Sequence, residues 1–85
     1  MRNEFIITAI TNVDKYAEFH ILGRGSVYAK FGYFDRIASL VFGASYSTAI
    51  FPVKVRVDEL GFNYFHVKSI FRNGCWYTLK DDFKN

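Results

Sequence analysis

Residues that could do catalytic or metal chemistry are few in this chain and lie far apart. They are two histidines, His20 and His66, and one cysteine, Cys75. A structural zinc site needs about four closely spaced ligands, so these residues predict no metal centre. No local motif orients Cys75 or His66, and only a tertiary contact could join them into a nucleophilic pair. The sequence therefore predicts a protein that is not an enzyme, with no catalytic residue and no cofactor.

The segment Gly23-Arg24-Gly25 is a short glycine loop, a type of segment that can hold a phosphate. It lacks the lysine and the strand-to-helix setting of a phosphate-binding loop, whereas a three-residue hairpin turn accounts for both glycines. Arg24, at the tip of this turn, is predicted to be exposed. Its guanidinium could bind a phosphate, or a carboxylate on a partner.

Recognition by aromatic rings flanked by cations is the other chemistry that the residues allow. Aromatic residues make up 20% of the 85 residues, and the net charge is +3. This is more aromatic side-chain surface than one small core readily buries. Alternation along the last three predicted strands gathers rings and cations on one sheet face. That face carries Lys54, Arg56, Phe65, Val67, Phe71, Trp76, Thr78 and Lys80.

Three interpretations of this face stay open. Trp and Arg dominate protein–protein hot spots, so the face could bind another protein or a second copy of the chain. Rings beside cations can also stack on unpaired bases while the cations meet phosphates, as in a single-stranded nucleic-acid-binding domain. Alternatively, the N-terminal hairpin covers the face. The predicted binding residues are Lys54, Arg56, Phe65, Phe71, Trp76 and Lys80, together with Arg24.

Six predicted strands position these residues. Stretches rich in β-branched and aromatic residues, bounded by turn residues, predict them. They span residues 4–11, 16–22, 26–31, 53–57, 62–72 and 75–80. The predicted fold is a single small α+β domain over residues 1–85, with two antiparallel meanders around one helix (β-β-β-α-β-β-β) and a frayed tail at residues 81–85.

This order of elements resembles that of the oligonucleotide-binding barrel. Closure into such a barrel, or into one like the SH3 domain, would leave the 53–57 strand as an extra or a split strand. The central helix is predicted over roughly residues 36–42, because Ile37 and Val41 share a helix face. Asp35 is suited to cap its beginning, and Gly43 is suited to end it.

Turn lengths decide which residues of the first meander share a face. A three-residue turn at 23–25 opposes Glu18 to Lys30, an opposite-charge pair that supports a ladder. The same register collects an apolar face, to which a four-residue turn at 12–15 adds further residues. That face is predicted to comprise Ile6, Thr8, Ile10, Ala17, Phe19, Ile21, Val27, Ala29 and Phe31.

In the second meander, Asn73-Gly74 predicts a two-residue type I′ hairpin that pairs Arg72 with Cys75. A four-residue loop at 58–61 would pair Val57 with Phe62. The core face would then comprise Val53, Val55, Val57, Phe62, Tyr64, Ile70, Cys75, Tyr77 and Leu79. One residue of slip in the 58–61 loop would exchange the two faces.

Composition also bears on class, location and source. A single cysteine forms no internal disulfide, and a buried reduced thiol suits the cytoplasm. The pattern predicts no signal peptide and no membrane span, so we expect a soluble, cytoplasmic protein without membrane contact. Abundant Phe, Tyr, Ile, Asn and Lys, which AT-rich codons supply, suit a small phage-encoded modulator or inhibitor of a host factor, acting in the host cytoplasm.

Overall fold

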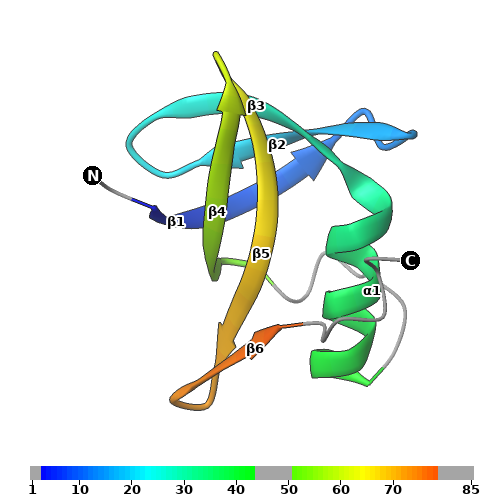
Figure 1. The fold of residues 1–85 in the computed structure, drawn as a ribbon, viewed down its shortest axis with the longest axis vertical. Coiled ribbons are helices and arrows are strands. Elements are labelled where there is room, and N and C mark those ends of the chain that lie inside the picture. Colours follow the sequence, from blue (N-terminus) through cyan, green and yellow to red (C-terminus); the bar gives the residue numbers. More distant parts are fainter. Residues whose placement is uncertain (1–2, 44–50, 79–85) are drawn as a thin grey trace.

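Six strands and one helix form along residues 3–43 and 51–78, the part of the chain that the structure, a computed structural model, describes (Figure 1). The elements are β1 (Glu4–Thr11), β2 (Tyr16–Ile21), β3 (Gly25–Lys30), α1 (Phe31–Phe42), β4 (Val53–Gly61), β5 (Tyr64–Arg72) and β6 (Cys75–Thr78). The β-β-β-α-β-β-β order predicted for a small α+β domain is therefore confirmed. The predicted tail at residues 81–85 lies outside the described residues.

Five strands, β1, β2, β3, β4 and β5, pair with one another in a closed ring. The strands neighbour one another in the order β3-β2-β1-β4-β5-β6, and a parallel pairing of Tyr28 with Tyr64 joins β3 back to β5. The strand that begins at Val53 pairs with β1 on one side and β5 on the other. It is therefore a full member of the ring, neither extra nor split, and β6 is the strand that lies outside it.

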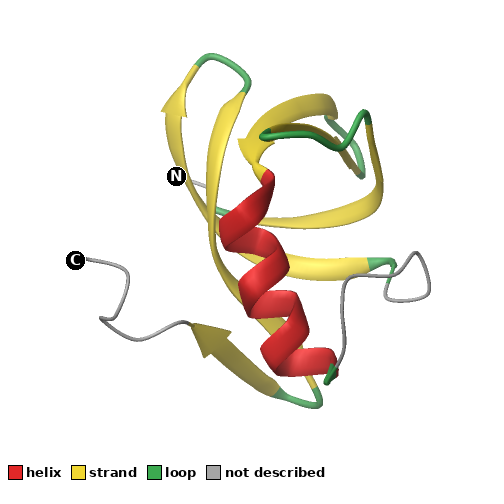
Figure 2. Ribbon diagram, turned by 90° about the vertical axis from the view of Figure 1, so that its right-hand side faces the viewer, coloured by secondary structure: helices red, strands yellow, loops and turns green. Residues whose placement is uncertain are grey.

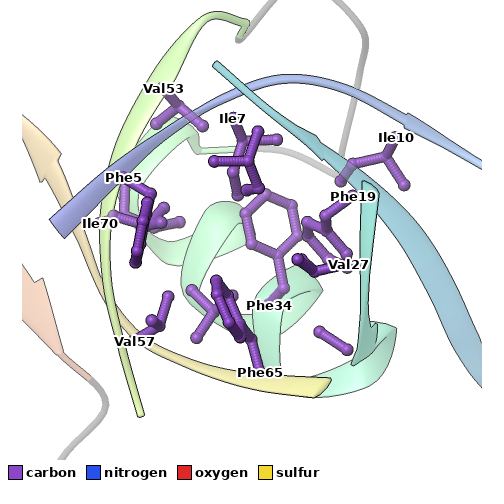
Figure 3. Packing of buried hydrophobic residues seen from close by; sticks show 14 of the residues in the cluster. Phe5, Ile7, Ile10, Phe19, Val27, Phe34, Val53, Val57, Phe65 and Ile70 are labelled. Carbon is purple, nitrogen blue, oxygen red and sulfur yellow. The ribbon is translucent and has the colours of Figure 1, made fainter. Parts of the chain in front are cut away.

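Helix α1 packs against β5, and its Phe34 reaches the middle of the core (Figures 2 and 3). Phe34 is fully buried and meets Phe19 edge to face, with 5.2 Å between ring centroids. The helix begins at Phe31, so Asp35 lies inside it and is not its N-cap. The side chain of its N-cap residue, Lys30, makes no capping hydrogen bond, and burial of the apolar face supplies the stability instead. Gly43 ends the helix in the left-handed conformation, as predicted.

The first meander keeps its predicted faces on β2 and β3 but changes its register. Glu18 lies opposite Tyr28, whereas the sequence predicted Lys30. Gly25, with a φ of 104°, begins β3 instead of closing the turn, and the pairing slips by two residues. An even slip leaves every side chain on its face. The residues buried as predicted are Ala17, Phe19, Ile21, Val27 and Ala29.

A bulge in β1 overturns part of the predicted apolar face. The pairing of β1 with β2 shifts around Thr8, and the extra residue reverses the alternation. Phe5, Ile7 and Ile10 are therefore buried. Ile6 is only half-buried and Thr8 is exposed, so their assignment to the core was wrong.

The turn between β4 and β5 is where the prediction for the second meander fails. β4 runs on to Gly61, and the turn is Phe62-Asn63, with Asn63 at a φ of 55°. Asn tolerates this left-handed conformation, so a two-residue turn replaces the predicted four-residue loop. Two register shifts follow along the hairpin. Phe65 and Val67, predicted on the cation-bearing face, are buried in the core, and Phe62, predicted in the core, is 93% exposed.

The Asn73-Gly74 hairpin forms as predicted and pairs Arg72 with Cys75. Because β6 lies outside the ring, Cys75 and Tyr77 are exposed, and their assignment to the core was wrong. The other predicted core residues divide into the buried Val53, Val55, Val57 and Ile70, the half-buried Tyr64, and Leu79, which lies outside the described residues.

Candidate functional site

Four residues of the predicted binding set come together on the outer side of β4, β5 and β6. They are Lys54, Arg56, Phe71 and Trp76, and we name them the cation–ring face. Both cations alternate with three buried valines of β4, so they point away from the core. Cross-strand pairing places Phe71 between Lys54 and Trp76. Lys54 is exposed, and the other three residues are half-buried.

Each ring of this face has a cation over it. The Lys54 Nζ lies 5.3 Å from the Phe71 ring centroid, and the Arg56 Cζ lies 4.0 Å from the Trp76 centroid. The two rings meet at 5.1 Å, tilted by 59°. Arg56 also pairs with Glu4, with 3.3 Å between Nε and Oε2. Each such cation–ring contact contributes about 0.5–1 kcal/mol at an exposed site, so the face is ordered by its own contacts.

The N-terminal strands extend the sheet beside this face and do not cover it. β1 pairs edge to edge with β4, with Ile6 opposite Lys54. The interpretation in which the N-terminal hairpin buries the face is therefore wrong. A depression of about 300 Å³ adjoins the face; it is lined by Asn3, Glu4, Phe5, Ile6 and Lys54.

Phe65 and Arg24, also predicted to bind a partner, instead belong to the core and its cover. Phe65 is 1% exposed, and its ring lies 5.3 Å from that of Phe5. The Arg24 guanidinium lies 4.7 Å from the Phe65 centroid and pairs with Glu59 at 2.9 Å. Arg24 thus closes over buried rings and is already engaged by a carboxylate. Lys80, the last predicted binding residue, lies outside the described residues.

A polar cluster surrounds His20 on the outer side of β1, β2 and β3. The Thr11 Oγ1 lies 2.8 Å from His20 Nε2, and the Ser26 Oγ lies 3.3 Å from Nδ1. Hydrogen bonds from Ser26 and Asn12 hold the pKa of the Glu18 carboxyl below its usual value. Since these polar groups bond to one another, the cluster acts as a brace between strands.

Cys75 and His66 are not brought together. Cys75 pairs with Arg72 at one end of β5, whereas His66 lies near the other end and stacks on Tyr33, with 4.6 Å between ring centroids. Burial lowers the pKa of His66, and the nearby carboxylate of Asp58 opposes this effect. The Cys–His pair considered from the sequence therefore does not form.

Sequence reasoning missed a second surface, which we name the tyrosine face. It consists of Tyr16, Tyr28, Lys30, Tyr64 and Phe62. Tyr16, Tyr28 and Phe62 are 43%, 51% and 93% exposed. A signal was present in the sequence, because the two tyrosines of β2 and β3 alternate with residues that were correctly assigned to the core.

Other features bear on the class of protein. Within residues 3–43 and 51–78, no three His, Cys, Asp or Glu side chains gather closely enough to hold a metal ion. In the same part of the chain, no helix has the length and apolar character needed to cross a membrane. Comparison of the chain with protein-family models, with curated proteins and with solved structures found no match.

Proposed function

We propose that this chain is a non-enzymatic protein that binds another protein through the cation–ring face. The observation that supports this most is the continuous outer row formed by Lys54, Phe71, Trp76 and Arg56 across three strands. Trp and Arg are the residues that most often dominate the energy of protein–protein interfaces. A face already ordered by its own contacts loses little side-chain entropy on binding.

Single-stranded nucleic acid is the alternative occupant of this face, and its geometry favours a protein. A base that stacked on Trp76 would have to displace the Arg56 guanidinium, which lies 4.0 Å from the indole centroid. Glu4 also pairs with Arg56, so the guanidinium charge that would attract a phosphate is already engaged by a carboxylate. The first feature weakens base stacking and the second weakens phosphate binding, and neither opposes the packing of a partner's side chains around the edges of the rings.

The surroundings of the face indicate which partner chemistry would fit. The lining of the adjoining depression includes the apolar Phe5 and Ile6 together with Lys54. A partner that presents an apolar side chain next to a carboxylate would fill the depression and pair with Lys54. A phage-encoded inhibitor of a host protein would act in this way, in the host cytoplasm, and a second copy of the chain could also cover the face.

The test is a comparison of matched variants in capture from an extract of the native host. Trp76→Ala and Lys54→Glu should lower the affinity for a captured protein by about tenfold or more, the loss typical of hot-spot residues. Lys68→Glu is the control, because it makes the same charge change at an exposed lysine that belongs to neither the cation–ring face nor the tyrosine face. Equal capture by the wild type and both face variants, with circular dichroism showing that all remain folded, would disprove the proposal.

Light scattering over a range of concentrations separates self-association from binding of another protein. If the partner is a second copy, the wild type should form a dimer that Trp76→Ala dissociates. If the wild type is a monomer at every concentration, the proposal rests on a partner protein alone.

A further inference from the structure

The tyrosine face lies on the outer side of three neighbouring strands. Tyr16 on β2 is paired with Lys30 on β3, and Tyr28 on β3 is paired with Tyr64 on β5. The backbone N–H of Tyr28 donates to the carbonyl of Asn63 at 2.8 Å, which sets Tyr28 beside the β4–β5 turn. Phe62 projects from that same turn. Tyr16, Tyr28 and the half-buried Tyr64 therefore lie side by side across β2, β3 and β5, and Phe62 is exposed at the adjoining turn.

The most exposed of these rings have open faces. Among residues 3–43 and 51–78, neither Tyr28 nor Phe62 has a cation or a second ring over it. Tyr16 and Tyr64 touch each other with 5.9 Å between centroids, tilted by 54°. An exposed ring with an open face is what an unpaired base needs for stacking.

Cations border these rings. Lys30 is exposed on the same side of β3 as Tyr28, and Lys15 is exposed in the loop before β2. The Lys15 carbonyl accepts a hydrogen bond from the N–H of Phe31, so this loop lies next to the end of β3. Arg24 pairs with Glu59, whereas Glu18, opposite Tyr28 and hydrogen-bonded to the neutral Asn12, keeps its negative charge. Within residues 3–43 and 51–78, no carboxylate pairs with Lys15 or Lys30, so both ammonium groups are available to phosphates.

We propose that the tyrosine face binds single-stranded nucleic acid, a function separate from protein binding at the cation–ring face. Tyr28 and Phe62 stack on successive unpaired bases, and the Tyr16 and Tyr64 pair borders them. Lys30 and Lys15 contact the phosphates. The ligand is single-stranded because bases within a duplex present no open face to a ring.

The test measures the anisotropy of a fluorescein-labelled oligothymidylate at low salt, with the wild type and five variants. Tyr28→Ala and Phe62→Ala should each weaken binding by about 5- to 150-fold, the range for loss of one stacked base. Tyr28→Phe keeps the ring and should bind like the wild type. Lys30→Ala should make the dependence of log affinity on log salt concentration less steep, by the amount that one phosphate contact contributes. Tyr77→Ala, which removes an exposed tyrosine of β6, is the control and should change nothing.

Three results would overturn the proposal. The first is no binding of the oligothymidylate by the wild type. The second is binding that persists unchanged in Tyr28→Ala and Phe62→Ala, and the third is equal affinity for a duplex of the same length. Capture of a protein that depends on Tyr28 while the oligonucleotide does not bind would assign this face to a protein instead. None of these results bears on Trp76 or Lys54, so protein binding at the cation–ring face is tested separately.

Discussion

The cation–ring face and the tyrosine face draw on the same residue types, rings and cations, yet they offer a partner different surfaces. In the cation–ring face, Arg56 and Lys54 lie over the rings of Trp76 and Phe71. In the tyrosine face, no cation within residues 3–43 and 51–78 lies over the ring of Tyr28 or Phe62, and Lys30 is exposed on the same side of β3 as Tyr28. Whether an aromatic surface can stack on a base therefore depends on where the cation lies relative to the ring. Composition alone does not decide it.

Ladder neighbours explain the difference. Pairing sets Lys54 directly opposite Phe71, within reach of its ring. Tyr28 has Glu18 on one side and Tyr64 on the other, so neither neighbour brings a cation over it. Phe62 sits in the turn between β4 and β5, outside the residues that these two strands pair. Residues of the same types therefore form two surfaces with different chemistry, because the strand register places different neighbours beside them.

The largest expected effect concerns Phe65, which the sequence placed on the cation–ring face. Because it is buried beneath Arg24, Phe65→Ala should lower the free energy of unfolding by about 3–5 kcal/mol, measured by urea denaturation. The matched control is Phe62→Ala, at a 93% exposed position, which should stay within about 0.5 kcal/mol of the wild type. A small effect at Phe65 would mean that the β4–β5 register is different and that the two faces have been divided wrongly.

A smaller effect is expected from coupling within the cation–ring face. A double-mutant cycle of Arg56→Ala and Trp76→Ala should give a coupling energy of about 0.5–2 kcal/mol, because the guanidinium lies over the indole. The same cycle with Lys30→Ala and Tyr28→Ala, in the tyrosine face, should be additive within about 0.5 kcal/mol. Equal coupling in the two cycles would remove the distinction drawn between the faces.

A pH effect is expected at His66, which lies on β5 next to the tyrosine face and opposite Asp58. Burial lowers its pKa in the folded chain, an effect that Lys68 and Lys30 reinforce and Asp58 opposes. The unfolded chain then binds a proton before the folded chain does. The free energy of unfolding should therefore fall as the pH drops below about 6.5, the usual histidine pKa, and level off below the folded value.

The variant His66→Phe keeps a ring against Tyr33 and cannot take up the proton. Its urea midpoint should fall less than that of the wild type over the same pH range. An identical fall in both proteins would show that the buried imidazole is not the group responsible.

The smallest effect is expected for Tyr28→Ala, whose free energy of unfolding should stay within about 0.5 kcal/mol of the wild type in thermal or urea unfolding. Half of this residue is exposed, and no cation in the part of the chain that the structure describes lies over its ring. A large loss of stability would show that the ring is a packing element, and the open surface proposed for nucleic acid would then be lost.

Much of the fold followed from local patterns. Alternation located all six strands, and Asn73-Gly74 fixed the β5–β6 pairing because both residues accept positive φ. The site was predicted only in part, since Lys54, Arg56, Phe71 and Trp76 came together while Phe65 and Arg24 did not. The helix begins at Phe31, before the predicted cap at Asp35. Burial of Phe34 stabilises the helix more than a cap at Asp35 would.

What the sequence determined by itself was the order of the elements, and the outward direction of Lys54 and Arg56 beside the valines of β4. What only the tertiary structure decided was register. The bulge around Thr8 and the turn at Phe62-Asn63 each depend on which side chains the closed ring can bury. A slip of one residue costs little locally, but it exchanges every side chain between core and surface. The ring therefore selected the register that buries Phe65 and leaves Phe62 exposed.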